Sequence, residues 1–441
     1  MLGRDRIAEI LGQAMSCSDA DMTQASMSIG RWSLTRFANS IIHQNVSEHN
    51  AQLSVKAVIG KRVGAATTNK LDDESIRAVA RKAFEFARNS PENPDFVTLP
   101  EPKPISDVDA YDARTADYSP EDRAGDVAGM IGEAKKLGAS ASGQLSTGYD
   151  EYAVVNSLGV SAYYPSTTAT LTTVMAADSG FGYADRFAAR VSEIGPIEAA
   201  VEAATRSVRS KDPQPIEPGE YDVVLLPYAV TDLVEALAWL GLGAKSVQEG
   251  RSFMCGKMGE KITGANITIW DDALDPNGIP RPFDSEGVPK QRIDLIVNGV
   301  AKGIVYDTFT AKKEGRESTG HALSPVGAPY PMATNVFMQP GDSSVEEMIA
   351  STKKGVLVTR FHYTNVIHPI LTIITGMTRD GTFLIEDGKI TKPVKNMRFT
   401  DNVLERLSNV EMISRETMRQ SCTVIPAIKA RAFRFTGATE F

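Results

Sequence analysis

Three Asx-Gly pairs in the second half of the chain place the strongest constraint on its fold. They are Asn298-Gly299, Asp380-Gly381 and Asp387-Gly388, and each stands between runs of apolar or alternating residues. Asx and Gly accept the positive φ angles that tight hairpin turns require. The sequence therefore predicts hairpins at all three places. We expect a predominantly antiparallel, β-rich C-terminal domain with few helices.

The first 92 residues alternate between helical and strand patterns. Residues 4–17 carry apolar side chains at helical spacing, and residues 72–88 begin with acidic residues and continue with basic ones, as the helix dipole favours. Between them, residues 51–58 and 65–68 read as strands around a glycine-containing turn at 60–64. A helix that backs antiparallel strands gives an α+β arrangement.

Two proline-rich stretches, 91–104 and 211–219, divide the chain into three portions. The middle portion is expected to contain helices at 120–137 and 197–210, strands at 139–147, 151–157 and 160–177, and a hairpin turn at 156–159. We therefore predict an α+β protein with an N-terminal α/β portion containing an antiparallel sheet (1–92), a middle hairpin-rich portion (105–212) and a C-terminal β-rich domain (219–441).

Charge and apolar patterning exclude some classes of protein. The formal net charge of -8 argues against nucleic-acid binding, which needs a basic surface. No run approaches the ~20 apolar residues of a membrane span, and the N-terminus lacks the apolar core of a signal peptide. Three widely separated cysteines, Cys17, Cys255 and Cys422, imply no disulfide framework. The cytoplasm is the expected location.

The five histidines do not follow the pattern of a zinc site. His43 and His49 are six residues apart, as are His362 and His368, and no histidine lies between His49 and His321. In an extended strand, six residues at ~3.3 Å each separate two side chains by roughly 20 Å. Neither pair can share a metal unless the chain folds back between its two members, so we interpret them as surface or hydrogen-bonded strand histidines.

A strand-like run at 220–226, a turn at Pro227 and an apolar helix at 231–242 resemble a segment of the TldD/PmbA family of zinc peptidases. The resemblance continues through residues 55–68, 250–262, 333–341, 359–369 and 375–400. In that family the helix bears an HExxxH motif, and its three positions fall here on Glu235, Ala236 and Leu240. Alanine and leucine cannot ligate zinc. The chain is therefore similar to the PmbA (TldE) type, which keeps the fold without the motif.

This resemblance implies a subunit without catalytic or metal-binding residues of its own. Such a chain would pair with a zinc-bearing TldD-like protein, or with itself, and act on peptides or unfolded proteins. Zinc is expected in the partner and no cofactor in this chain. Glu235 has no obvious group to activate, so we interpret it as a solvated or capping acid rather than as a general base.

An independent peptidase or hydrolase is the alternative. Catalytic members of the family are thought to add a C-terminal cysteine ligand, and Cys422 with His321 and His362 would have to assemble a metal site in three dimensions. Cys422 lies in an apolar strand pattern, where packing is the more common role of a free cysteine.

A long loop rich in glycine and proline, 314–331, is the remaining candidate for function. Loops of this length in compact domains are often functional. We predict that Arg316 and His321 of this loop, with Arg360 and His362, line a peptide groove. A mobile surface loop is an equally acceptable interpretation.

Overall fold

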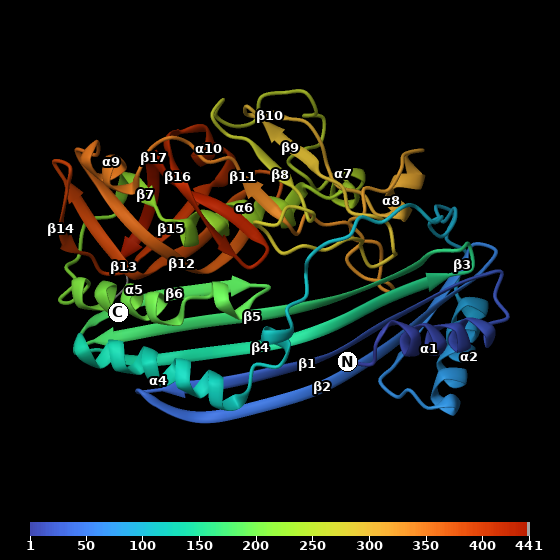
Figure 1. Cartoon of the computed structure of the whole chain (residues 1–441). Helices are drawn as coiled ribbons and strands as arrows, with labels where there is room; N and C mark the ends of the chain where they lie inside the picture. Colours follow the sequence, from blue (N-terminus) through green and yellow to red (C-terminus); the bar gives the residue numbers. More distant parts are fainter. Residues whose placement is uncertain (439–441) are drawn as a thin grey trace.

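The structure is a computed structural model and describes residues 1–438 of the 441-residue chain. Two sheets organise it, one built by the first two portions of the chain and the other by the third (Figure 1). This confirms the α+β class. Among residues 1–438, no helix is both long enough and apolar enough to cross a bilayer.

The first sheet is antiparallel throughout and has six strands in the order β3-β2-β1-β4-β5-β6. Its strands are β1 (Met22–Ala38), β2 (Ile41–Ile59), β3 (Arg62–Thr68), β4 (Ser140–Asn156), β5 (Ser161–Ala177) and β6 (Gly180–Ala188). β1 pairs with β4 from Gln24↔Asn156 to Phe37↔Gly143, so the N-terminal and middle portions contribute to the same sheet. The two strands expected at 139–147 and 151–157 form the single strand β4, and the hairpin turn after it is confirmed.

Two groups of helices cover one face of this sheet, at opposite ends of its long strands (Figure 1). They are α1 (Arg4–Ser16) with α2 (Asp73–Asn89), and α4 (Pro120–Lys136) with α5 (Pro196–Arg209); the short α3 (Ala113–Ala116) and the 3-10 turn η1 (Val191–Glu193) lie in the connections. Ala141 and Leu145 of β4 pack under the second pair, and Ala153 packs under the first. Because all three are odd-numbered residues of one strand, they point to the same face.

Local capping explains why these helices begin where they do. The Asp72 side chain accepts a hydrogen bond from the backbone N–H of Ser75 at the start of α2. At the start of α4, Ser119 and Asp122 cap each other's backbone N–H groups, and Pro120 occupies the first turn. These are the residue types that satisfy the free N–H groups of a helix end. The four predicted helices of the first two portions are confirmed.

The second sheet has eleven strands, and its order is mixed. The strands are β7 (Gly219–Leu225), β8 (Ile269–Asp271), β9 (Ile293–Val297), β10 (Val300–Ala301), β11 (Val336–Met338), β12 (Lys354–His368), β13 (Ile373–Glu386), β14 (Lys389–Pro393), β15 (Met397–Asn402), β16 (Val410–Gln420) and β17 (Thr423–Ala438). β7 pairs in parallel with β12 and antiparallel with β17. Since β17 also pairs with β15, the strands β7, β12, β13, β15 and β17 close into a ring.

The helix of the strand–turn–helix segment is α6 (Pro227–Gly241), which begins four residues before the predicted start. It packs mainly against β12 and β17. Most of its side chains are buried, which explains why its sequence is apolar on nearly all sides. The other helices of this domain are short: α7 (Ala244–Gln248), α8 (Thr308–Lys313), α9 (Val345–Ala350) and α10 (Val403–Ser408).

Two of the three predicted Asx-Gly hairpins are confirmed, and one prediction was wrong. Asn298-Gly299 joins β9 to β10, and Asp387-Gly388 joins β13 to β14. Asp380-Gly381 lies inside β13, where both residues have positive φ (53° and 119°) and the pairing with β12 shifts register. The dipeptide therefore forms an irregularity within a strand, because the long partner strand β12 continues past it.

Candidate functional site

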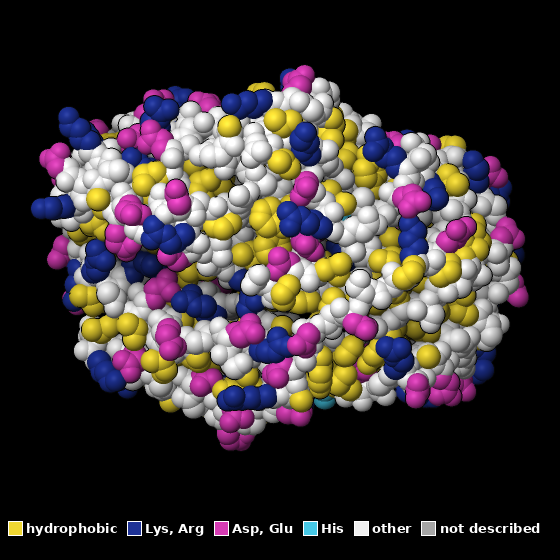
Figure 2. Space-filling view, turned by 45° about the horizontal axis from the view of Figure 1, so that its top comes forward, with side chains coloured by type: hydrophobic (Ala, Val, Ile, Leu, Met, Phe, Trp, Pro, Cys, Tyr) yellow, Lys and Arg dark blue, Asp and Glu magenta, His cyan; other side chains and the backbone are white. Residues whose placement is uncertain are grey.

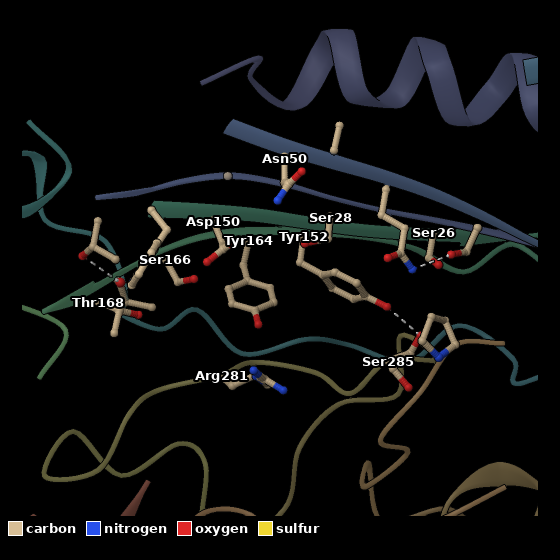
Figure 3. A pocket seen from close by; sticks show the side chains of 18 of the residues that line it. Ser26, Ser28, Asn50, Asp150, Tyr152, Tyr164, Ser166, Thr168, Arg281 and Ser285 are labelled. Atoms are coloured by element: carbon tan, nitrogen blue, oxygen red, sulfur yellow. Dashed lines mark hydrogen bonds between the residues drawn. The ribbon is translucent and has the colours of Figure 1, made fainter. Parts of the chain in front are cut away.

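A cavity of about 1080 Å³ lies between the first sheet and the C-terminal domain. Its floor is the sheet face that the helices leave uncovered, and polar side chains stand on it at alternate positions (Figure 3). They are Ser26 and Ser28 of β1, Asn50, Gln52 and Ser54 of β2, Asp150 of β4, and Ser166 and Thr168 of β5. Strand alternation puts these even-numbered residues on one face. With Glu48 of β2, which also lines the cavity, the floor therefore presents hydroxyls, amides and two carboxylates.

Gly30 leaves the space that Asp150 occupies on this floor. The two residues are directly paired across β1 and β4, and a Cβ atom on Gly30 would come within 2.4 Å of Asp150 Oδ1. Burial raises the pKa of Asp150, while the positive charge of Arg281 across the cavity lowers it. Any side chain at position 30 would have to displace the carboxylate.

The opposite wall comes from the loop between β8 and β9. Phe283 of this loop is buried against two floor residues, with ring centroids 6.1 Å from Tyr152 and 5.1 Å from Tyr164. The Tyr152 hydroxyl also donates a 2.9 Å hydrogen bond to the carbonyl of Ser285. These contacts attach the C-terminal domain to the sheet and fix the depth of the cavity.

A second cavity, of about 620 Å³, adjoins the first at α6. The two share four lining residues, Ile279, Arg281, Leu323 and Cys422. On the helix side the second cavity is lined by Asp232, Glu235, Ala236, Ala238 and Trp239. The polar floor of the first sheet and one face of α6 thus border a connected space, with these four residues at its junction.

Two carboxyl groups of α6 line the second cavity. Glu235 accepts a 3.1 Å hydrogen bond from the Thr423 hydroxyl, and Asp232 accepts one of 2.6 Å from the Thr364 hydroxyl. Burial raises the pKa of both carboxyl groups, and the charge of Asp232 adds to the rise at Glu235. Glu235 is therefore a hydrogen-bonded wall residue of the cavity and not a capping residue.

The three positions that match the family's zinc motif do not form a metal site. Glu235 and Ala236 line the second cavity, but Leu240 is only 7% exposed and packs in the hydrophobic core. Ala236 and Leu240 offer no donor atom. Within residues 1–438, no three His, Cys, Asp or Glu side chains lie close enough together to hold a metal ion. The residues of α6 do not fit a catalytic zinc ion, which normally takes three protein ligands.

His321 and Arg316 of the long loop lie outside both cavities. His321 is fully buried, with Nε2 2.8 Å from Asp271 Oδ1 and Nδ1 2.9 Å from the carbonyl oxygen of Thr319. Burial lowers the pKa of this imidazole. The Arg316 side chain is exposed, 5.8 Å from the Tyr306 ring. The cavity is lined instead by Leu323 and Pro325 of the same loop.

Arg360 and His362 lie two residues apart on β12, away from the long loop. The Arg360 guanidinium pairs with Asp380 and stacks 4.1 Å from the Tyr183 ring of β6, so it holds the C-terminal domain against the first sheet. His362 lines a separate cavity of about 620 Å³ together with Tyr363 and Arg379. The four residues expected to line one groove are therefore not brought together.

Cys422 is also separated from the two histidines of the alternative metal site. It lies at the junction of the first two cavities, whereas His321 is buried against Asp271 and His362 lines the third cavity. Burial raises the pKa of the Cys422 thiol, with Arg281 opposing the rise. The thiol is thus held in its neutral form.

Sequence reasoning missed the residues at the centre of the site. Asp150, Tyr164 and Arg281 face the same space from three segments that are distant in the sequence (Figure 3). One signal was available, because small or polar residues recur at every second position in 26–30 and again in 48–54. That pattern indicates a strand face whose side chains are small or polar although another part of the protein lies over it.

Comparison with known proteins matches the chain to a family of metallopeptidases. Residues 218–437 match the model described as the PmbA/TldA metallopeptidase C-terminal domain, and residues 25–87 match PmbA/TldA metallopeptidase domain 1. A metalloprotease of Methanothermobacter thermautotrophicus is 31% identical over 47% of this chain and 45% of its own length. The metalloprotease PmbA of Escherichia coli O157:H7 is 24% identical over 95% of this chain and 92% of its own. Several relatives are matched over less than half of their length.

Solved structures share the whole architecture. TldE from Thermococcus kodakarensis superposes with a TM-score of 0.89 and 22% identity, covering 98% of this chain and 99% of its own. A protein from Thermotoga maritima described as a putative modulator of a DNA gyrase gives a TM-score of 0.88 at 21% identity, covering 97% and 100%. At these identities the likeness concerns the fold.

Proposed function

The chain belongs to the PmbA/TldA metallopeptidase family, and from this premise we propose that it is a non-catalytic subunit that holds peptides for a zinc-bearing TldD-like partner. The proposal rests on the residues of α6 that line the second cavity. There Glu235 and Ala236 occupy positions that bear zinc-binding chemistry in catalytic relatives, and Leu240 is in the core. On this proposal, a chain that has the cavity but lacks donor atoms at Ala236 and Leu240 contributes binding surface.

The polar floor of the first cavity suits a peptide in extended conformation. A peptide carries a donor and an acceptor on nearly every residue, and hydroxyl and amide side chains can satisfy both. The floor provides them from four neighbouring strands, β2, β1, β4 and β5, with Ser28, Asn50 and Asp150 among them. Because these groups are not specific for any one side chain, peptides or unfolded segments are the substrate class that we propose.

Exposed apolar side chains near the second cavity support pairing with another chain. Ile367, Ile370 and Leu371, which we call the β12–β13 tip, are 55%, 47% and 51% exposed. Trp239 and Leu323, which line the second cavity, are also about half exposed. Figure 2 shows one face of the molecule, on which hydrophobic side chains form patches between charged ones. Exposed apolar patches of this kind often mark protein interfaces.

Two apolar segments, 356–363 and 370–374, are candidates for an interface by sequence, and in the structure each is divided between core and surface. Val356, Val358 and Phe361 of the segment 356–363 are buried in the core, whereas Tyr363 is exposed. In the segment 370–374, Ile370 and Leu371 are exposed and Ile374 is buried. We therefore assign the partner surface to the β12–β13 tip, and we expect a complex that buries ~2,000 Å² or more.

The proposal is tested by mixing the purified chain with a TldD-like protein from the same genome. We expect light scattering to detect a complex, and peptidase activity to rise above that of the TldD-like chain alone. A strictly monomeric chain that leaves both the size and the activity of the TldD-like chain unchanged would contradict the proposal. Light scattering on the isolated chain also distinguishes a homodimer from a chain that needs its partner.

We expect the purified chain to hold no stoichiometric zinc, because α6 offers no imidazole and a catalytic site normally takes three protein ligands. Elemental analysis after dialysis measures this, with a TldD-like protein bearing HExxxH as the positive control. About one tightly held zinc per chain, lost on Cys422→Ser or His362→Ala, would contradict the expectation and favour an independent hydrolase.

Restoring the motif is not expected to restore activity. In the triple variant Glu235→His, Ala236→Glu, Leu240→His, the new imidazole at position 240 would lie in the hydrophobic core, where Leu240 packs. Residues that orient metal-bound histidines would also be missing, which typically costs roughly 10- to 100-fold in affinity or activity. The measurement is zinc content and peptide cleavage by the triple variant alone. Robust zinc-dependent cleavage would show that position 240 reaches the cavity.

A further inference from the structure

Arg281 occupies the junction between the two adjoining cavities and lines both of them. Its side chain is exposed, but the surface that it exposes is cavity wall (Figure 3). Pro280 and Pro282 flank it, and its backbone N–H donates a 2.8 Å hydrogen bond to the carbonyl of Ala273. Since each proline fixes its own φ and restricts the residue before it, the guanidinium is presented from a stiff segment.

No carboxylate of residues 1–438 lies within ion-pair distance, 4.0 Å, of the Arg281 guanidinium. Asp150 faces Arg281 across the first cavity, and two further carboxylates near the junction have other partners. Asp271 binds His321 and the backbone N–H of Asn335, both at 2.8 Å, and Asp284 accepts the backbone N–H groups of Glu286, Val288 and Ala322. Tyr164, whose hydroxyl faces Arg281, is the principal neighbour of the guanidinium.

A second basic side chain, Lys290, lies behind this junction and lines neither cavity, and Asp271 and Asp284 are near it. Lys290 is 5% exposed, and the described chain places no carboxylate within 4.0 Å of its ammonium group. Burial lowers the pKa of Lys290, the charges of Asp271 and Asp284 oppose this, and the charge of Arg281 adds to it. Charges removed from bulk water are costly unless they are paired. Arg281 is therefore the cationic group that lines the junction without a carboxylate of residues 1–438 within 4.0 Å, and it can bind an anion supplied from outside the chain.

We propose that Arg281 binds a carboxylate of the peptide held in the cavity. The guanidinium fork matches the two oxygens of a carboxylate, and the Tyr164 hydroxyl can donate a further hydrogen bond to the same group. The carboxylate is either the C-terminus of the peptide or an acidic side chain, since both present the same chemistry. This inference rests on the proposed peptide-holding function and adds an anchoring point to it.

Three fluorescently labelled decapeptides of Ala, Gly and Ser test the inference on the purified chain by anisotropy. One has a free C-terminal carboxylate, the second is its C-terminal amide, and the third is the amide with one internal Glu. We expect the free acid to bind roughly 10- to 100-fold more tightly than the plain amide, the range for a hydrogen bond to a charged group. Equal affinity of the Glu-containing amide and the free acid would identify acidic side chains as a second source.

Variants of Arg281 identify the residue responsible. Arg281→Gln should remove the difference between acid and amide, and Arg281→Lys should retain part of it, because the charge remains without the fork. Arg77→Gln is the matched control, since Arg77 is an exposed residue of α2 remote from the cavities. The wild-type comparison needs no variant, so it remains informative if Arg281→Gln fails to fold.

The outcomes separate this inference from the proposed function. If all three peptides bind wild-type chain equally, the Arg281 site is overturned and peptide holding survives. An acid preference that persists in a folded Arg281→Gln variant also overturns it. If none of the peptides binds to the chain alone or to its complex with a TldD-like partner, the peptide-holding function itself fails.

Discussion

Replacing Ile370 and Leu371 together by Asp should abolish the pairing of this chain with a TldD-like partner. Both side chains are about half exposed at the β12–β13 tip, so the free chain should tolerate the change. In a complex each new carboxylate would be buried without a partner, at a cost of at least ~1–3 kcal/mol apiece. Two such costs correspond to a loss of affinity of roughly 100-fold or more. Light scattering on mixed chains over a range of concentrations measures it.

A substitution elsewhere on the surface provides the control. Phe86 of α2 is 46% exposed on the helix-covered side of the first sheet, so Phe86→Asp should leave pairing unchanged. Melting curves of both variants verify that each is folded. If the double variant still forms the complex with wild-type affinity, the β12–β13 tip is not the partner surface, and the exposed Trp239 and Leu323 become the next positions to substitute.

Phe433→Ala should cost ~3–5 kcal/mol in the free energy of unfolding, the range for truncating a buried aromatic residue. Phe433 is fully buried in the ring of strands, where its centroid lies 5.6 Å from that of Phe361, 5.4 Å from Phe399 and 5.1 Å from Phe435. The guanidinium of Arg406 also lies 5.6 Å from its ring. Truncation would therefore remove contacts with several elements at once and leave a void among stiff aromatic neighbours.

Denaturant unfolding followed by circular dichroism measures this loss. The matched control is Phe181→Ala on β6, because Phe181 is 48% exposed and loses little buried surface on truncation. Surface substitutions of that kind usually change stability by no more than ~0.5 kcal/mol. A loss below ~1 kcal/mol for Phe433→Ala would mean that the aromatic cluster adjusts to fill the space and does not act as the centre of the C-terminal core.

The sequence alone determined the features that depend on neighbouring residues. The helices α2 and α4 could be placed because Asp72 and Ser119 cap them locally. The turns at Asn298-Gly299 and Asp387-Gly388 follow from the φ angles that these residues accept. The lack of side-chain donor atoms at Ala236 and Leu240 of α6 could also be read directly, whatever the fold.

Only the tertiary structure decided which strands pair and which side chains face each other across the cavities. The pairing of β1 with β4 joins residues more than a hundred positions apart, and it creates the floor on which Gly30 makes room for Asp150. The same Asx-Gly chemistry gave a strand irregularity at Asp380-Gly381, because the partner strand β12 continues past it. Arg281 meets Tyr164 and Cys422 only when three distant segments close around one space. Local chemistry fixes turns and caps within a few residues, whereas a cavity depends on long-range packing that no single segment encodes.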